Sequence, residues 1–157
     1  MTSTLNALFD KLTYVAQTGK LSEGKELMLQ YNGSDWLQYV CYKPTYYHKE
    51  LVKCSIDMEM YIISWKSNTS SCIHDHPENG CIVKLLRGEL QEDTYEKVDD
   101  DNTVCFISSR RMHENDIGYM ESNKIVHSIT NPTDDTCVSL HIYSKPLYVH
   151  TAYDKIK

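Results

Sequence analysis

The hydrophobic pattern of the chain changes once, between an N-terminal part and the remainder. Across residues 5–15, apolar side chains recur every three or four positions, which predicts an amphipathic helix with one buried face. A second helix is expected to begin after Ser22 and to end at Gly33. A short third helix is expected from Ser34, a good N-cap residue, to about Cys41. The first 45 residues are therefore expected to form a helical prelude.

From about residue 50 onwards, short runs rich in β-branched and aromatic residues replace the helical pattern. Arg87-Gly88 separates two of these runs and predicts a hairpin, and the acidic run at residues 99–102 predicts a turn. The expected strands lie at residues 58–65, 82–86, 90–95, 103–107, 117–120, 125–131 and 138–144. Many short strands separated by turns predict a mainly β fold, a sandwich or a small barrel, preceded by short helices.

Length, charge and cysteine usage narrow the range of functions. The chain has 157 residues, 41% hydrophobic and 24% charged, with a formal net charge of -6. We expect one domain over residues 1–157, with the β-barrel from residue 46. Basic residues do not cluster and no apolar run reaches ~18 residues, which argues against nucleic-acid and membrane partners. No secretory signal is visible, so we expect a cytoplasmic monomer whose six cysteines are reduced and mostly buried.

The most informative stretch is SSCIHDHPENGC at residues 70–81. His74 and His76 are two positions apart, so on an extended segment both imidazoles leave the same face and can reach one metal ion. An HxH pair alone is equally compatible with a structural role. A third ligand must come from another strand, and His127, about fifty residues further on, is the best candidate. Three histidines without such a context are interpreted as surface or loop residues: His48, His113 and His150.

Two motifs in the chain resemble those of the cysteine dioxygenase family. SCIHDH at residues 71–76, Cys81 and KLLRGEL at residues 84–90 resemble the first cupin motif of that family. VSLHIYS at residues 138–144 is similar to the strand that completes the active site of these enzymes. The similarity extends over roughly residues 21–154. It implies a cupin fold, which is a small β-barrel or double-stranded β-helix, behind the short N-terminal helices.

The resemblance also implies a metal and a reaction. One Fe(II) per chain would bind to His74, His76 and His127, and O2 would oxidise a small thiol, L-cysteine, to cysteine sulfinic acid. Many cupins add a glutamate ligand after the HxH pair, but here Cys81 stands at that position. Three neutral imidazoles leave the full charge of the ion, which favours an incoming thiolate. The choice of iron rests on the resemblance, because imidazole sites generally bind Zn(II) more tightly than Fe(II).

Further roles around the metal follow from the same resemblance. It implies that Cys81 and Tyr143 become joined by a thioether bond, a protein-derived cofactor beside the iron. Ser139, His141 and Tyr143 alternate along one strand and so share a face. By resemblance they form a hydrogen-bonded relay that directs the phenol hydroxyl of Tyr143 towards substrate or oxygen. Taken singly, Cys81 and Tyr143 are equally compatible with ordinary core positions.

Lys49, Ser144-Lys145 and Ile125, which replaces a glycine two residues before His127, depart from the family pattern. Lys49, with Tyr47 close by, stands where the family holds the substrate carboxylate with an arginine, and a solvated surface lysine is the alternative. Lysine lacks the planar fork of arginine, and one lost charge-assisted bond costs about 1.5–3 kcal/mol, or ten- to a hundredfold in affinity. Ser144-Lys145 replaces Ser-Pro, so a cis peptide bond is not expected there.

Two other functions stay open on the sequence alone. The first is a dioxygenase that acts on a different thiol, either 3-mercaptopropionate or the N-terminal cysteine of a peptide. The lysine at position 49 keeps this possibility open, because it changes the predicted carboxylate pocket. The second is a metal-binding cupin without catalytic activity.

Overall fold

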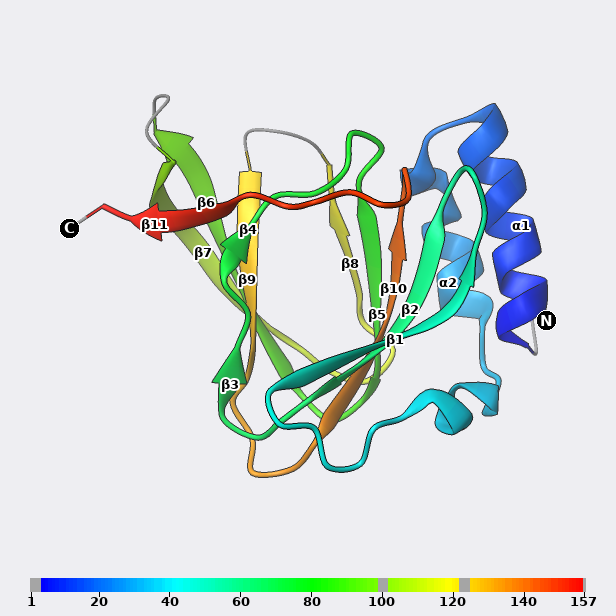
Figure 1. The fold of residues 1–157 in the computed structure, drawn as a ribbon, viewed down its shortest axis with the longest axis horizontal. Helices are drawn as coiled ribbons and strands as arrows, with labels where there is room; N and C mark the ends of the chain where they lie inside the picture. Colours follow the sequence, from blue (N-terminus) through cyan, green and yellow to red (C-terminus); the bar gives the residue numbers. More distant parts are fainter. Residues whose placement is uncertain (1–3, 99–101, 122–124, 157) are drawn as a thin grey trace.

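The computed structural model describes residues 4–98, 102–121 and 125–156, so most of the turn predicted at residues 99–102 lies outside the described residues. Two β-sheets form the body of the molecule, and short helices cover one of them (Figure 1). The five-stranded sheet has the order β1 (Tyr47–Cys54), β2 (Glu59–Trp65), β10 (Cys137–Tyr143), β5 (Cys81–Arg87) and β8 (Ile117–Met120).

The second sheet has six strands and closes on itself, because β9 also pairs with β6. Its order is β3 (Thr69–Ser70), β9 (Ile125–Asn131), β4 (Ile73–His74), β11 (Ala152–Lys155), β7 (Thr103–Met112) and β6 (Leu90–Val98). β6 and β7 form a long hairpin whose second strand continues to Met112, beyond the end predicted at residue 107. The strand continues past residue 107 because residues 108–112 each pair with a residue of β6.

The first helix, α1 (Leu5–Thr18), begins where Thr4 caps it, with the Thr4 hydroxyl accepting a bond from the Ala7 amide at 3.1 Å. The second predicted helix is divided into a 3₁₀ turn, η1 (Leu21–Gly24), and α2 (Lys25–Gln30). α2 ends at Gln30, where the backbone of Tyr31 becomes extended, and the ammonium group of Lys84 on β5 binds the carbonyl oxygens at this end.

The third predicted helix is also a 3₁₀ turn, η2 (Asp35–Tyr39), and Ser34 makes no side-chain cap. The Asp35 carboxylate instead accepts bonds from the Leu5 amide at 2.8 Å and from the Tyr31 hydroxyl at 2.7 Å. These bonds tie the turn to the start of α1. None of the helices in the described part of the chain has the length and apolar character needed to span a bilayer.

The core lies on both faces of the five-stranded sheet. On its outer face the apolar side of α1 and α2 packs against alternate residues of β2 and β10, including Ile62 and Leu140. The residues between them point inward, towards the six-stranded sheet, and these include Trp65 on β2. Ser139, His141 and Tyr143 therefore share the inner face of β10, as their spacing predicts.

The six cysteines are all free, but their burial differs from the expectation. Cys81 and Cys137 are buried on the inner face of the five-stranded sheet. Cys54, Cys72 and Cys105 are exposed, so the prediction of mostly buried cysteines is wrong for these three. The first two close or precede strands, and Cys105 lies on β7, whose residues from position 105 to 111 face solvent.

Candidate metal centre and pocket

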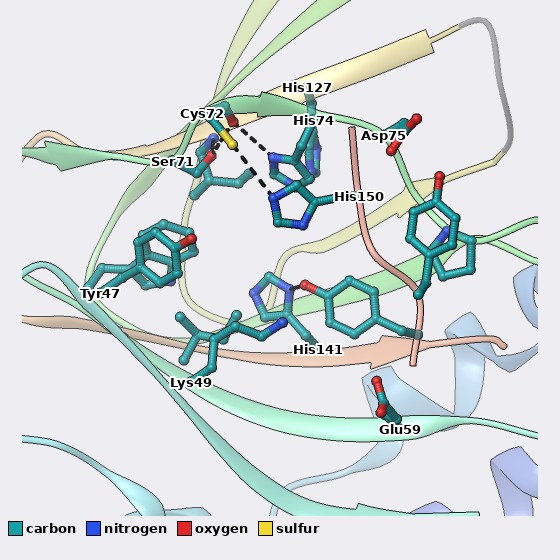
Figure 2. Close-up of a pocket in the computed structure, with 16 residues that line it drawn as sticks. Tyr47, Lys49, Glu59, Ser71, Cys72, His74, Asp75, His127, His141 and His150 are labelled. Carbon is teal, nitrogen blue, oxygen red and sulfur yellow. Dashed lines mark hydrogen bonds between the residues drawn. The ribbon is translucent and has the colours of Figure 1, made fainter. Parts of the chain in front are cut away.

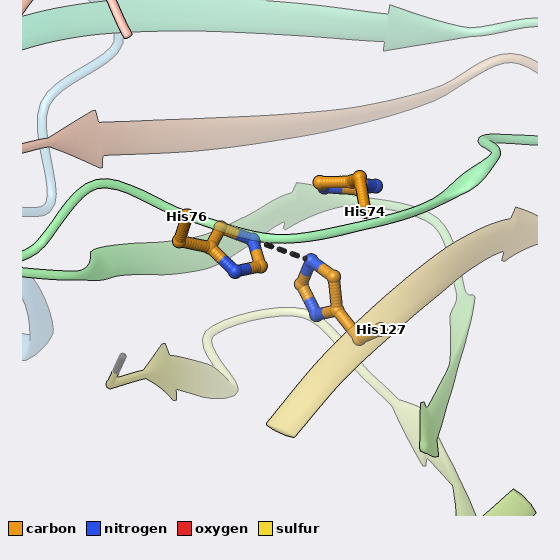
Figure 3. Close-up of side chains that lie close together, drawn as sticks. All are labelled: His74, His76 and His127. Atoms are coloured by element: carbon orange, nitrogen blue, oxygen red, sulfur yellow. Dashed lines mark hydrogen bonds between the residues drawn. The ribbon is translucent and has the colours of Figure 1, made fainter. Parts of the chain in front are cut away.

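Three histidines, two on neighbouring strands and one on the segment that follows β4, converge on one point (Figure 3). His74 on β4 lies directly opposite His127 on β9 in the strand register, and His76 follows two residues after His74. The Nε2 atoms of His76 and His127 are 3.0 Å apart, and one ring nitrogen of each of the three residues lies within 4.8 Å of the others. The structure thus brings together the three residues that the sequence pattern selected.

The geometry of this cluster fits a bound metal ion. Metal–imidazole bonds of about 2.1 Å place two ligands at right angles about 3.0 Å apart, the separation seen between His76 and His127. His74 donates its Nδ1 hydrogen to the carbonyl oxygen of Cys72 at 2.9 Å, and His127 donates its Nδ1 hydrogen to Glu92 at 3.0 Å. In both residues Nε2 therefore keeps the lone pair that a metal requires.

Burial and mutual proximity keep two of the three histidines, His74 and His76, uncharged. Desolvation, reinforced by the neighbouring His127, lowers the pKa of His74 to about 3. The same two causes hold the pKa of His76 well below its usual 6.5. Both imidazoles are neutral at neutral pH, which is the protonation state of a histidine ligand. A proton on either residue would compete with the metal.

The hydrogen bonds expected between Ser139, His141 and Tyr143 on β10 are present. They continue to one further residue that was not predicted, Trp65 on β2. Trp65 Nε1 donates to Ser139 Oγ at 2.8 Å, which leaves the hydroxyl hydrogen of Ser139 for His141 Nε2, also at 2.8 Å. His141 then donates from Nδ1 to the Tyr143 oxygen at 3.1 Å. The indole can only donate, so it fixes the direction of the hydrogen-bonded chain, in which the Tyr143 oxygen is the last acceptor.

The buried His141 gives the stability of the protein a dependence on pH. Desolvation, followed by the charge of Lys49, holds its pKa well below 6.5 in the folded chain. The unfolded chain therefore binds more protons once the pH falls below about 6.5, and stability decreases with falling pH. In urea unfolding from pH 7 to pH 5, we expect His141→Gln to lose less stability than the parent, by up to about 1.4 kcal/mol per pH unit. Equal slopes for the two proteins would contradict this assignment.

Cys81 and Tyr143 lie directly opposite each other on β5 and β10. Cys81 is 1% exposed, and its thiol is hydrogen-bonded to the Tyr143 side chain. Desolvation raises the pKa of Cys81, although the charge of Lys49 partly opposes this, and desolvation also raises the pKa of Tyr143 well above its usual value. The two side chains are thus in contact and both protonated at neutral pH.

Lys49 and Tyr47 on β1 line the pocket that also contains His74, His127 and Tyr143 (Figure 2). The ammonium group of Lys49 lies 4.4 Å from the centre of the Tyr61 ring and 4.9 Å from that of Tyr143. Burial against these rings lowers the pKa of Lys49, even though the residue is exposed overall at the pocket mouth. Lys49 is therefore an exposed lysine whose ammonium group lies beside the aromatic rings of the pocket, and its role in substrate binding stays a prediction.

The interpretation of His150 as a surface or loop residue is incomplete. His48 and His113 are exposed, as expected, and His150 is also exposed on the segment after β10. Its imidazole, however, lines the pocket, with its ring centre 5.2 Å from that of His74 and its Nε2 3.8 Å from Cys72 Sγ. Cys72 and His150 together form a polar edge of the pocket that the sequence pattern does not reveal.

Asp75, between the two neighbouring histidines, fastens the segment that carries His150. One carboxylate oxygen accepts a bond from the Thr151 amide at 2.7 Å, and the other accepts from the Tyr153 hydroxyl at 2.9 Å. These bonds join the loop between β4 and β5 to the start of β11. The pocket wall is thus attached to the same short stretch of chain that holds the candidate ligands.

The peptide bond between Ser144 and Lys145 is cis, so the expectation that the missing proline excludes this form is wrong. Ser144 is buried, and its surroundings define its conformation. Its hydroxyl donates to the Asp57 carbonyl oxygen at 2.8 Å, and its amide donates to the Gly80 carbonyl oxygen at 3.2 Å. Tertiary contacts at this position outweigh the local preference of the residue type.

Solved structures with a similar backbone identify the fold. A Klebsiella pneumoniae protein with a double-stranded β-helix domain gives a TM-score of 0.57 at 13% identity, covering 75% of this chain and 93% of that chain. A cupin superfamily protein from Desulfitobacterium hafniense gives 0.50 at 14% identity, covering 67% of this chain and 83% of the other. At these identities the likeness shows the fold alone, and it confirms the predicted cupin behind short N-terminal helices.

Comparisons of sequence give the family. Residues 3–156 match the family model described as cysteine dioxygenase type I. Cysteine dioxygenase type 1 of Rattus norvegicus is 30% identical over 127 residues, which are 79% of this chain but only 64% of the rat protein. The Danio rerio protein of the same name is 27% identical over 97% of this chain and 80% of its own length. The chain belongs to the cysteine dioxygenase type I family.

Proposed function

We propose that this protein is an Fe(II)-dependent dioxygenase that converts L-cysteine and O2 to cysteine sulfinic acid. The observation that carries the proposal is the cluster of three histidines beside a pocket that also holds a tyrosine relay and a cationic group. Membership of the family supports a cupin thiol dioxygenase. We further propose that it acts in the cytoplasm as a single-domain monomer on a free small thiol.

His74, His76 and His127 would hold the iron through three imidazole nitrogens. When bound, Fe(II) supplies Lewis-acid and redox chemistry that the side chains of the pocket lack. No carboxylate joins the three histidines in the cluster of described residues, so the charge of the ion remains available to a thiolate.

The remaining pocket residues position the substrate. The ammonium group of Lys49 faces the pocket and would bind the substrate carboxylate, with Tyr47 beside it. The hydroxyl of Tyr143 would donate its hydrogen to substrate or oxygen, because His141 and Ser139 already satisfy the other side of that oxygen. These roles place the charged end of the substrate at β1 and its reacting end at the histidines.

Oxygen uptake with three thiols tests the proposal directly. Purified protein loaded with iron is expected to consume O2 with L-cysteine and to release a sulfinate. Faster turnover with 3-mercaptopropionate, or turnover only with a peptide that begins with cysteine, would replace the substrate and keep the chemistry. Bound iron without oxygen uptake on any of the three would show a metal-binding cupin without catalytic activity.

We expect Lys49→Met to raise the KM for cysteine about ten- to a hundredfold while kcat changes less. The substitution removes the charge that would bind the substrate carboxylate but leaves the histidines and the relay unchanged. Initial rates over a range of cysteine concentrations measure the effect. Lys53→Met is the matched control, because Lys53 is a half-buried lysine on the same strand that does not line the pocket. A KM equal to that of the parent would remove Lys49 from the binding site.

A thioether between Cys81 and Tyr143 is also proposed, because the two side chains are in contact across β5 and β10. The bond would join the sulfur to a ring carbon, with loss of the thiol hydrogen and one ring hydrogen to O2 as the oxidant. After aerobic incubation with iron and cysteine, intact mass should fall by two hydrogen atoms, and peptide mapping should place the change on these two residues. Cys81→Ala is expected to show no such loss, and an unchanged parent mass would contradict the cross-link.

A further inference from the structure

Glu92 on β6 is a buried carboxylate that no role described so far explains. It is 5% exposed, and its two oxygens have different partners. Oε2 lies 3.0 Å from Nδ1 of His127, and Oε1 accepts from Nε of Arg110 at 2.8 Å. A buried charge is costly unless it is paired and hydrogen-bonded, and here both oxygens are occupied.

The outer nitrogens of the three candidate ligands have unequal partners. Nδ1 of His74 donates to a backbone carbonyl oxygen, that of Cys72. Nδ1 of His76 has no hydrogen-bond partner among the described residues. Among the hydrogen bonds of the described residues, only the one from Nδ1 of His127 goes to a carboxylate. One carboxylate, that of Glu92, is therefore hydrogen-bonded to the cluster, and it contacts the outer nitrogen of His127 rather than the point where the three ring nitrogens converge.

We propose that Glu92, held in place by Arg110, is a positioning residue that orients His127 towards the metal through its outer ring nitrogen. This inference rests on the proposed function, because it assumes that the three histidines bind an ion. A carboxylate on Nδ1 fixes the tautomer with the lone pair on Nε2 and makes that nitrogen a stronger donor. Because the carboxylate acts through the ring, it occupies no coordination position, and substrate and O2 keep theirs.

The surroundings of Arg110 show how the carboxylate is held. Arg110 lies opposite Glu92 in the register of β6 and β7, and its Nη2 also reaches the Ile117 carbonyl oxygen at 3.4 Å. A Cβ atom at Gly118 would lie 2.9 Å from Nη2, so glycine leaves space for the guanidinium group. Arg110 is thus fixed at both ends of its fork, and it holds Glu92 against His127.

The neighbouring pair of Glu89 and Arg111 provides a matched control. Glu89 directly precedes β6 and Arg111 lies on β7, with Arg111 Nη1 2.7 Å from Glu89 Oε1, but both side chains are more than one third exposed. The contacts described for Glu89 include none with the three histidines. Glu89→Gln therefore removes a similar ion pair without changing the cluster, whereas Glu92→Gln removes the charge and keeps the size of the side chain.

Binding of Co(II) alone to the metal-free protein tests the proposal without any turnover. The dissociation constant is measured by competition with a chelator, and the visible absorption of bound Co(II) reports its ligand environment. We expect Glu92→Gln to bind Co(II) about 10- to 100-fold more weakly with an altered spectrum, and Glu89→Gln to match the parent. Arg110→Gln should weaken binding by a smaller factor in the same direction.

Affinity and spectrum equal to those of the parent in folded Glu92→Gln would overturn the inference and leave the proposed function intact. If Glu92→Gln does not fold, the surface substitution Arg110→Gln decides, and unchanged Co(II) binding in that variant overturns the inference. A parent protein that binds neither Co(II) nor Fe(II) would overturn the proposed function itself. Urea unfolding of each metal-free variant separates a loss of affinity from a loss of fold.

Discussion

Replacing His127 with alanine is expected to abolish both metal retention and thiol-dependent oxygen uptake. The residue is 1% exposed and contributes one of three nitrogens to the candidate site. Loss of a residue that only supports a ligand lowers metal affinity about 10- to 100-fold, and loss of a ligand itself should exceed that range. Metal content per chain after gel filtration, together with oxygen consumption in the presence of cysteine, measures the two effects.

His113→Ala is the control for this experiment, because His113 is exposed and lies outside the pocket. It should retain iron and activity at the level of the parent. The alanine at position 127 also leaves the Glu92 carboxylate without its imidazole partner, so stability should fall as well. Full iron content and full activity in His127→Ala would refute the three-histidine site.

Lys84→Met is expected to lower the free energy of unfolding by about 2–4 kcal/mol. Lys84 on β5 is 1% exposed, and its ammonium group donates to the carbonyl oxygens of Tyr31 at 2.6 Å, Met28 at 2.8 Å and Leu29 at 3.3 Å. Methionine fills the space but leaves these carbonyls without a donor. Desolvation of the ammonium, which lowers the pKa of Lys84, offsets part of the loss.

Urea unfolding at pH 7 measures this change, with Lys53→Met as the comparison. Lys53 also bridges a strand and a helix, since its ammonium lies 2.9 Å from the Asp10 carboxylate, but both side chains are more than one third exposed. An exposed pair of this kind contributes at most about 1 kcal/mol. If both substitutions lower the free energy of unfolding equally, the buried hydrogen bonds between Lys84 on β5 and the end of α2 stabilise the fold no more than an exposed ion pair does.

Most strands that the sequence predicts are long enough to show a period, although the eight-residue β1, whose residues are largely exposed, is not predicted. β2, β5, β9 and β10 each have seven residues, so their alternating or continuous apolar character can be read locally. β3 and β4 have two residues each, too few for any pattern, and they form because β9 offers ladder partners to both and β11 offers further partners to β4. Their register depends on residues about sixty positions away, which no local window contains.

The residues of the candidate site also fall into two groups, those that the sequence reveals and those that it does not. His74 and His76 can be selected from the sequence because two residues of spacing on an extended segment fix a common face. Glu92, Trp65 and His150 could not be selected, since each reaches the site through a tertiary contact that spacing does not encode. Glu92 reaches His127 because its strand, β6, pairs with β9, the strand that carries His127. This pairing is visible only in the structure.

The pairing of β4 with β9 has a consequence for how the chain acquires an ion. His74 and His127 become neighbours only when these two strands meet, and the unfolded chain has no equivalent arrangement. An ion that binds the native cluster and not the unfolded chain adds about 2.7 kcal/mol of stability when its free concentration is a hundred times the dissociation constant. Scarcity of the ion would then shift part of the population towards unfolded chains, which proteases remove, so supply of the ion sets how much protein persists as well as how fast it works.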